Sequence, residues 1–236
     1  MDQPQPRLYR YIDFITASFV AVLIISNIAS TKTVIIGSLT FDGGTVIFPL
    51  AYIFGDVLTE VYGYKRARRV IWTGFLWIIV TAGVLAIIDA LPPEPFWNQI
   101  EGITGFTKGQ GFSLILGQAP RIVLGSLIAY FAGEFTNSFI LAKMKIATKG
   151  RALWTRTIGS TLVGQFVDTS VFLVVAFYGV FPNEVLLTIF VSNYIFKVSV
   201  EALFTPVTYA AVRFLKRAEA EDYYDTKTNF NPFALR

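Results

Sequence analysis

The sequence contains neither cysteine nor histidine. Their absence excludes disulfides, thiolate zinc sites, cysteine nucleophiles and histidine proton relays. Charged residues are scarce as well: they make up 15% of the 236 residues, where soluble domains have roughly 25%. Hydrophobic residues make up 54% of the chain, which is too much apolar surface for a disordered protein. The composition therefore favours a membrane protein, and we expect no bound metal and no cofactor.

Six apolar stretches are long enough to cross a bilayer, which takes about 20 mostly apolar residues. They run approximately over 11–31, 44–63, 70–90, 112–134, 157–180 and 185–213. The first is followed by no small-residue cleavage site of the A-x-A kind, so we expect a retained span and no signal peptide. The loops are too short for a separate domain. We therefore predict an all-α integral membrane protein, with residues 1–236 forming one bundle of six transmembrane helices.

Lysine and arginine are distributed unevenly over the predicted loops. Fourteen of them lie before the first span, between spans two and three, between spans four and five, or after the last span, whereas only Lys32 and Lys108 lie on the opposite side. Because basic residues in short loops mark the cytoplasmic side, both termini are expected in the cytoplasm. This orientation accounts for nearly all the excess of basic residues, so we expect no nucleic-acid partner.

Three connecting segments carry weaker signals. The segment 91–111 contains prolines and glycines that forbid a continuous helix, and it is either a cap on the membrane surface or a plain connector. The connection 135–156 is basic and amphipathic, so contact with anionic lipid is expected. The acidic tail beyond Leu215 is expected to be a solvated end.

Four ionisable residues lie at a similar depth in four different spans. They are about 14–18 Å from the starts of their spans, near the middle of a hydrocarbon layer about 30 Å thick. A charged side chain at that depth costs about 3 kcal/mol or more unless it faces a partner or a polar cavity. We therefore predict one polar binding site in the centre of the bundle, formed by Asp56, Arg121, Asp168 and Lys197.

Further polar and aromatic side chains belong to the predicted site. Most lie three or four residues from one of its charged members, on the same helix face, and two are amides in the first and last spans. These candidates are Tyr52, Glu60, Gln165, Tyr194, Asn27 and Asn193. A structural alternative stays open, in which Asp168 pairs with Arg121 only to hold the helices together. Asp56 could pair with Lys197 in the same way.

The chemistry of this set suits a planar polar heterocycle. Carboxylates accept hydrogen bonds from ring N–H and amino groups, lysine, arginine and amides donate to a carbonyl, and aromatic rings stack on the face. A guanine-like edge matches these groups well. The sequence has no G-x-x-x-x-G-K-[ST] phosphate loop, so ATP hydrolysis by that route is excluded. Protons, sodium ions or facilitated diffusion stay open as the driving force.

Several segments resemble a known family. The most specific runs from Phe48 to Arg68 and reads FPLAYIFGDVLTEVYGYKRAR; others are GEFTN at 133–137, QFVDT at 165–169 and YIFK at 194–197. They resemble the signature of the YhhQ-like queuosine precursor transporters, also called the vitamin uptake transporter family. The resemblance covers nearly the whole chain except the proline-rich segment and the acidic tail.

The resemblance implies a six-helix protein of the bacterial inner membrane. It implies import of 7-cyano-7-deazaguanine and its aminomethyl relative, precursors of the tRNA nucleoside queuosine, and a bundle related to the substrate-binding subunits of energy-coupling-factor transporters. The implied partners are thus a small-molecule base and the lipid bilayer, while the choice between monomer and homodimer stays open. Carried over residue by residue, the implied substrate contacts are Asn27, Asp56, Glu60, Arg121, Gln165, Asp168 and Lys197.

Two other functions stay under consideration. The chain could be a vitamin-binding subunit that needs a separate membrane coupler and ATPases. It could instead be an intramembrane enzyme in which Asp56 and Asp168 act as an acid/base pair. The second alternative is the weaker one, because nothing in the sequence resembles a nucleophile with its base.

Overall fold

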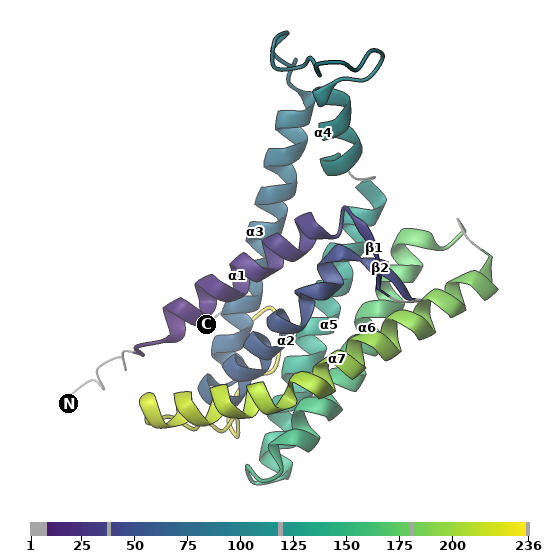
Figure 1. Ribbon diagram of the computed structural model, residues 1–236. Helices are drawn as coiled ribbons and strands as arrows, with labels where there is room; N and C mark the ends of the chain where they lie inside the picture. The colour runs from purple at the N-terminus through teal and green to yellow at the C-terminus, as the bar shows by residue number, and fades with distance from the viewer. Residues whose placement is uncertain (1–8, 37–38, 118–119, 180–181, 235–236) are drawn as a thin grey trace.

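The computed structural model describes residues 9–36, 39–117, 120–179 and 182–234. Within them the regular secondary structure is helical apart from one short hairpin (Figure 1). The elements are α1 (Ile12–Ala29), β1 (Thr33–Ile36), β2 (Leu39–Asp42), the 3-10 helix η1 (Gly43–Val46), α2 (Phe48–Val57), the π-helix η2 (Leu58–Tyr62), α3 (Tyr64–Ala90), α4 (Lys108–Leu116), α5 (Pro120–Ala147), α6 (Leu153–Phe177) and α7 (Asn183–Ala218). The antiparallel pair of β1 and β2 is an addition to the predicted all-α fold.

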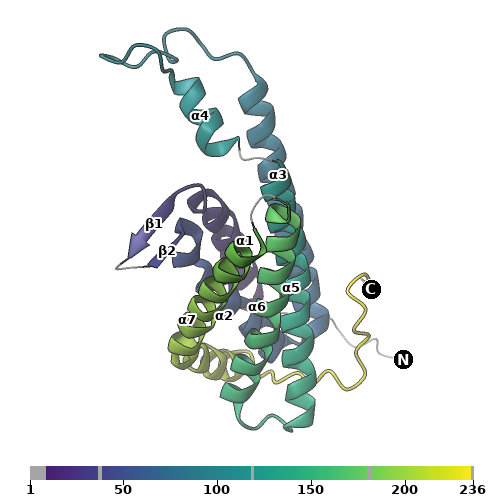
Figure 2. The ribbon, with the colours of Figure 1, turned by 90° about the vertical axis from the view of Figure 1, so that its right-hand side faces the viewer.

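Helices α5 and α6 form a closely packed hairpin joined by a short connection, and both views show them side by side (Figures 1 and 2). Glycines make the close approach possible. A Cβ atom on Gly133 would lie 2.6 Å from Cβ of Asp168, and one on Gly164 would lie 2.8 Å from Cβ of Asn137. Small residues let membrane helices approach in this way. The packing brings Asn137 and Asp168 to one helix interface.

The other long helices cross this hairpin at different angles. In Figure 1, α3 stands roughly upright beside α5, whereas α1 and α7 run obliquely across the bundle. Helix α2 and η2 lie against α1 and α7, and the apolar core between them includes Phe19, Leu58 and Val61, all at most 1% exposed. The residues of α2 are thereby held in the middle of the molecule.

The outer surface of the bundle is apolar. Helix α3 alone exposes Leu76, Trp77, Ile79, Val80, Val84, Ile87 and Ile88. A water-soluble protein rarely exposes so large an apolar surface, and a lipid-facing helix must. Within the part of the chain that the structure describes, four helices are long and apolar enough to cross a membrane: Ile12–Ala29, Tyr64–Ala90, Leu153–Phe177 and Leu186–Ala218. The chain is a helical membrane protein.

Two predicted boundaries are wrong. The span expected at 112–134 is divided, because α4 ends at Leu116 and α5 begins at Pro120. Gly117 ends α4, and proline is favoured in the first turn of a helix, where its missing N–H costs nothing. The connection expected at 135–156 is mostly helix, since α5 continues to Ala147.

The two ends of the described chain meet at one end of the bundle. The hydroxyl of Tyr9 donates to Glu221 at 2.6 Å, and the backbone N–H of Tyr11 donates to Glu219 at 2.7 Å. The expectation of a solvated acidic tail is therefore wrong: Glu219 and Asp225 are 8% and 2% exposed. We call this end, formed by residues 60–69, 145–156 and 213–225, the basic end.

Candidate functional site

An ion pair joins α6 to α7 inside the bundle. Nζ of Lys197 lies 2.8 Å from Oδ2 of Asp168, and the two side chains are 16% and 10% exposed. The pairing of Asp56 with Lys197, one of the two that the sequence left open, therefore does not form. The side chain of Arg121 lies outside the described residues, although its backbone belongs to α5.

Asp56 is paired with an amide and fully buried. Nδ2 of Asn137 on α5 donates to Oδ1 of Asp56 on α2 at 2.9 Å, and both residues are 0% exposed. Sequence reasoning missed Asn137 as a site residue, because the span was expected to end at 134. The signal that could have found it is the GEFTN segment, which belongs to the family resemblance.

Two more carboxyl groups lie in the same region. Glu134 on α5 is 1% exposed, and a Cβ atom on Gly55 would collide with its Oε1, so the carboxyl group rests against the α2 backbone next to Asp56. Glu201 on α7 is 2% exposed and interacts electrostatically with Asp56 and Glu134. Neither residue is among the predicted site residues, although Glu201 lies within the apolar stretch predicted at 185–213.

Tyr52 lies in this group, whereas Tyr194 has other contacts. The hydroxyl of Tyr52 is buried and interacts electrostatically with the surrounding carboxyl groups. The hydroxyl of Tyr194 donates to the carbonyl of Leu162 at 3.0 Å, and its ring stacks on Phe190. Asn193 is half-buried on α7.

We call the buried set on α2, α5, α6 and α7 the polar layer: Tyr52, Asp56, Glu134, Asn137, Gln165, Asp168, Lys197 and Glu201. Several of its oxygen atoms, among the described and fully buried ones, accept no hydrogen bond. They are Oδ2 of Asp56, Oε1 of Glu134, Oδ1 of Asn137 and Oε1 of Gln165. Buried polar atoms are almost always paired, so this layer is short of donors. It is suited to a ligand that supplies N–H groups.

Glu60 lies apart from these residues, at the basic end. Its carboxylate pairs with Nη2 of Arg156 and Nζ of Lys216, each at 2.7 Å, and its side chain is 0% exposed. Lys145 lies 3.7 Å from the same carboxylate and 2.6 Å from Asp222 of the tail. This network fixes the π-helix η2 to α5, α6, α7 and the tail, so a structural role accounts for Glu60.

Burial and pairing shift the protonation of two groups in this network. Burial lowers the pKa of Lys145, although Glu60 and Asp222 oppose the shift. Partial burial would raise the pKa of Asp222, but the hydrogen bonds from Lys145 and Lys216 outweigh it and hold the pKa below its usual value. Asp222 of the tail is therefore ionised when it pairs with Lys145 and Lys216.

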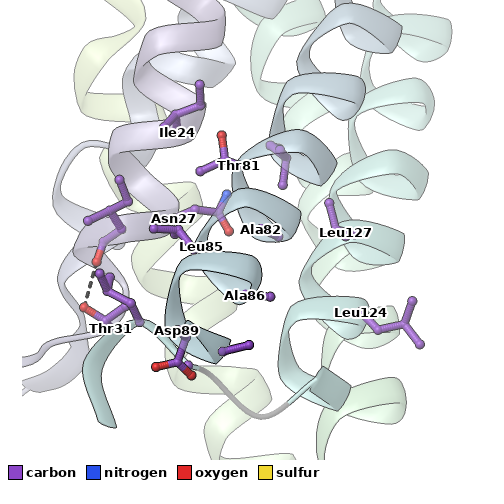
Figure 3. A pocket seen from close by; sticks show the side chains of 15 residues that line it. Ile24, Asn27, Thr31, Thr81, Ala82, Leu85, Ala86, Asp89, Leu124 and Leu127 are labelled. Carbon is purple, nitrogen blue, oxygen red and sulfur yellow. Dashed lines mark hydrogen bonds between the residues drawn. The ribbon is translucent and has the colours of Figure 1, made fainter. Parts of the chain in front are cut away.

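Asn27 lies in a different place again, in a pocket of about 540 Å³ between α1, α3, α4 and α5 (Figure 3). The pocket wall is mostly apolar, with Asn27, Thr31, Thr81 and Asp89 as polar groups. Nδ2 of Asn27 donates to the carbonyl of Leu23 at 3.2 Å, while Oδ1 of Asp89 accepts from Ser113 of α4 at 2.5 Å.

The structure thus brings together Tyr52, Asp56, Asp168 and Lys197, but neither Asn27 nor Glu60 with them. Within the described residues, no group of three acidic side chains is arranged to hold a metal ion.

Comparison with known proteins gives a consistent result. A family model described as "Putative vitamin uptake transporter" matches residues 42–211. A Bacillus subtilis protein named "Probable queuosine precursor transporter" is 33% identical over 195 residues, which cover 82% of this chain and 81% of that protein. An Escherichia coli protein named "Queuosine precursor transporter" is 25% identical over 204 residues, 85% of each chain. No solved structure gives a significant match.

Proposed function

Because the chain belongs to the vitamin uptake transporter family, we propose that it imports queuosine precursors through the polar layer. The substrates are 7-cyano-7-deazaguanine, its aminomethyl relative, or both. The family consists of transporters, so the chain is a transporter and not an enzyme. The relatives named for queuosine precursors support this substrate class.

The observation that carries the proposal is the partly exposed ion pair of Asp168 and Lys197 among fully buried groups. Asp168 and Lys197 keep 10% and 16% exposure of their side chains, whereas Asp56 and Asn137 are 0% exposed. A deazaguanine has adjacent N–H donors and a carbonyl acceptor on one edge. Asp168 accepts from the donors and Lys197 donates to the carbonyl, so that the edge of the base takes the place of their mutual contact.

Gln165 and Tyr52 complete the binding site. The unpaired Oε1 of Gln165 lies one helical turn from Asp168, where it accepts a further N–H of the base. The buried ring of Tyr52 supplies an aromatic wall from α2. Asn27 acts earlier, in the pocket of Figure 3, where a polar heterocycle rests before it reaches the layer.

The chain lies in the cytoplasmic membrane with its basic end in the cytoplasm. We assign six crossings: the four long apolar helices, α2 with η2, and α5. The positive charge of the basic end supports this orientation. An even number of crossings agrees with the contact between Tyr9 and Glu221 at one end of the bundle.

Uptake by cells tests the proposal. A queuosine auxotroph without its own transporter should accumulate labelled 7-cyano-7-deazaguanine when it produces this chain, and Asp168→Asn or Lys197→Met should reduce uptake at least about tenfold, the effect of losing about 1.4 kcal/mol. Asp13→Asn and Lys32→Met, at exposed positions, are the matched controls. Uptake that is equal in all four variants would contradict the assigned site. Activity of the purified chain alone in liposomes would exclude a requirement for a coupler and ATPases.

A further inference from the structure

Three carboxyl groups of the polar layer are buried without a cation. Asp56, Glu134 and Glu201 are 0%, 1% and 2% exposed. They interact electrostatically with one another. Among the side chains that the structure describes, no lysine or arginine forms an ion pair with any of the three.

Among the described side chains, the surrounding elements do not supply the missing charge. Lys197 of α7 is the described cation of the layer, and it is paired with Asp168 of α6 at 2.8 Å. Glu60 of η2 adds a further negative charge that acts on Asp56 from the basic end, where the cations that pair with Glu60 lie. The remaining titratable groups that face the cluster are the phenols of Tyr52 on α2 and Tyr130 on α5.

The hydrogen bonds around the cluster show the same deficit. Asn137, itself 0% exposed, donates Nδ2 to Asp56, and its Oδ1 has no donor. Oδ2 of Asp56 and Oε1 of Glu134 have none either. All of these atoms are acceptors when the carboxyl groups are ionised. A proton on a carboxyl group turns one of them into a donor and relieves both the missing hydrogen bond and the uncompensated charge.

We propose that Asp56, Glu134 and Glu201 form a proton-binding site, so that this transporter moves protons together with its organic substrate. The coupling rests on the proposed uptake function, whereas the proton site itself does not. Closing the bundle around the three carboxyl groups removes water from them, and burial of an unpaired carboxylate is strongly unfavourable. The occluded carrier therefore holds at least one proton. When the layer opens to water, the carboxyl O–H bond breaks, the proton passes to water and the carboxylate is hydrated.

Infrared spectroscopy of the purified chain in lipid tests the proton site without substrate. At about pH 7, well above the usual carboxyl pKa values of about 4, we expect a protonated carboxylic acid band. Asp56→Asn, Glu134→Gln or Glu201→Gln should weaken this band, and Glu94→Gln in the exposed loop should not. A spectrum with carboxylate bands only overturns the proposal. A compensating cation at the cluster, such as Arg121, would give that spectrum.

Proteoliposomes with a pH-sensitive dye inside test the coupling. Adding the base outside should acidify the lumen, and an acid-outside gradient should increase accumulation by up to about tenfold per pH unit for one proton per base. A variant of the cluster that still binds the base should lose both effects, with Glu94→Gln as the control. Uptake that does not depend on the pH gradient would overturn the proposed coupling of protons to the base. Absence of any uptake contradicts the proposed function instead, and leaves the infrared result to decide the proton site.

Discussion

Asp168 on α6 and Lys197 on α7 form an ion pair at 2.8 Å that is still 10% and 16% exposed. The fully buried ion pair of Glu60 and Arg156, at 2.7 Å, is its counterpart at the basic end. Both pairs involve charges inside or beside the membrane, but only the side chains of the first are partly exposed. We therefore expect a binding role for the first pair and a structural role for the second.

The ion pair of Asp168 and Lys197 should be needed for uptake more than for folding. Removing both charges in Asp168→Asn with Lys197→Met leaves no buried unpaired charge, so the double variant should unfold at a temperature close to that of the unmodified chain. It should still fail to accumulate the base. Thermal unfolding in detergent and uptake, measured on the same preparations, check this prediction. Recovery of uptake in the double variant would show that the pair serves structure alone.

Glu60 should be needed for folding. Glu60→Gln leaves Arg156, at 1% exposure, and its lysine neighbours without their carboxylate. Breaking a buried pair on one side costs about 3–5 kcal/mol, so the free energy of unfolding should fall by that amount. Denaturation in mixed micelles measures it. The exposed Glu184→Gln serves as the control, and equal stability of the two variants would refute the role of Glu60.

Gly63 should not tolerate a side chain. It has φ of +85°, and a Cβ atom there would collide with the ring of Tyr223 in the docked tail. Gly63→Ala should cost about 1–3 kcal/mol from the backbone alone and should also loosen the tail. Gly83→Ala on α3, where no atom lies within 4 Å of the added Cβ, should stabilise the helix by about 0.5–1 kcal/mol. Unfolding of the two variants side by side distinguishes them, and a neutral Gly63→Ala would contradict the docked tail.

Acid should release the tail. The pKa of Asp222 is lowered in the folded chain, because the hydrogen bonds from Lys145 and Lys216 outweigh the effect of its partial burial. A lowered pKa adds stability above the unfolded value of about 4, and that stability is lost as the pH falls through the folded pKa. The protection of the backbone amides of residues 219–234 against hydrogen exchange, relative to the intrinsic rate at each pH, should therefore fall below about pH 4. In Asp222→Asn this protection should be low already at neutral pH. A loss of protection in acid that survives in this variant would point to another group.

The sequence indicates a depth for the site, but it does not indicate the pairing within it. A bilayer requires long apolar segments, so Asp168 and Lys197 stand out at mid-depth. Which charges meet depends on the rotation of α6 against α7, which their weak amphipathicity leaves undetermined. The pairing of Asp56 with Lys197, which the sequence left open, is therefore not the one that forms, because Lys197 pairs with Asp168.

Asn137 and the tail show two further limits. Hydropathy falls after Glu134, so the span was expected to end there, yet no glycine or proline interrupts the chain until Gly150 and α5 continues. The tail docks through Asp222 and Asp225, and their partners Lys145 on α5 and Tyr64 on α3 lie far away in sequence. Such contacts come from tertiary packing and have no local signal.

Equilibrium binding of labelled 7-cyano-7-deazaguanine to the purified chain tests the central claim most directly. The account predicts saturable binding to the unmodified chain, binding at least about tenfold weaker after Asp168→Asn or Lys197→Met, and unchanged binding after Asp13→Asn or Lys32→Met. Binding that survives both changes in the polar layer but is lost after Asn27→Ala would contradict it, and would place the substrate in the pocket between α1, α3, α4 and α5.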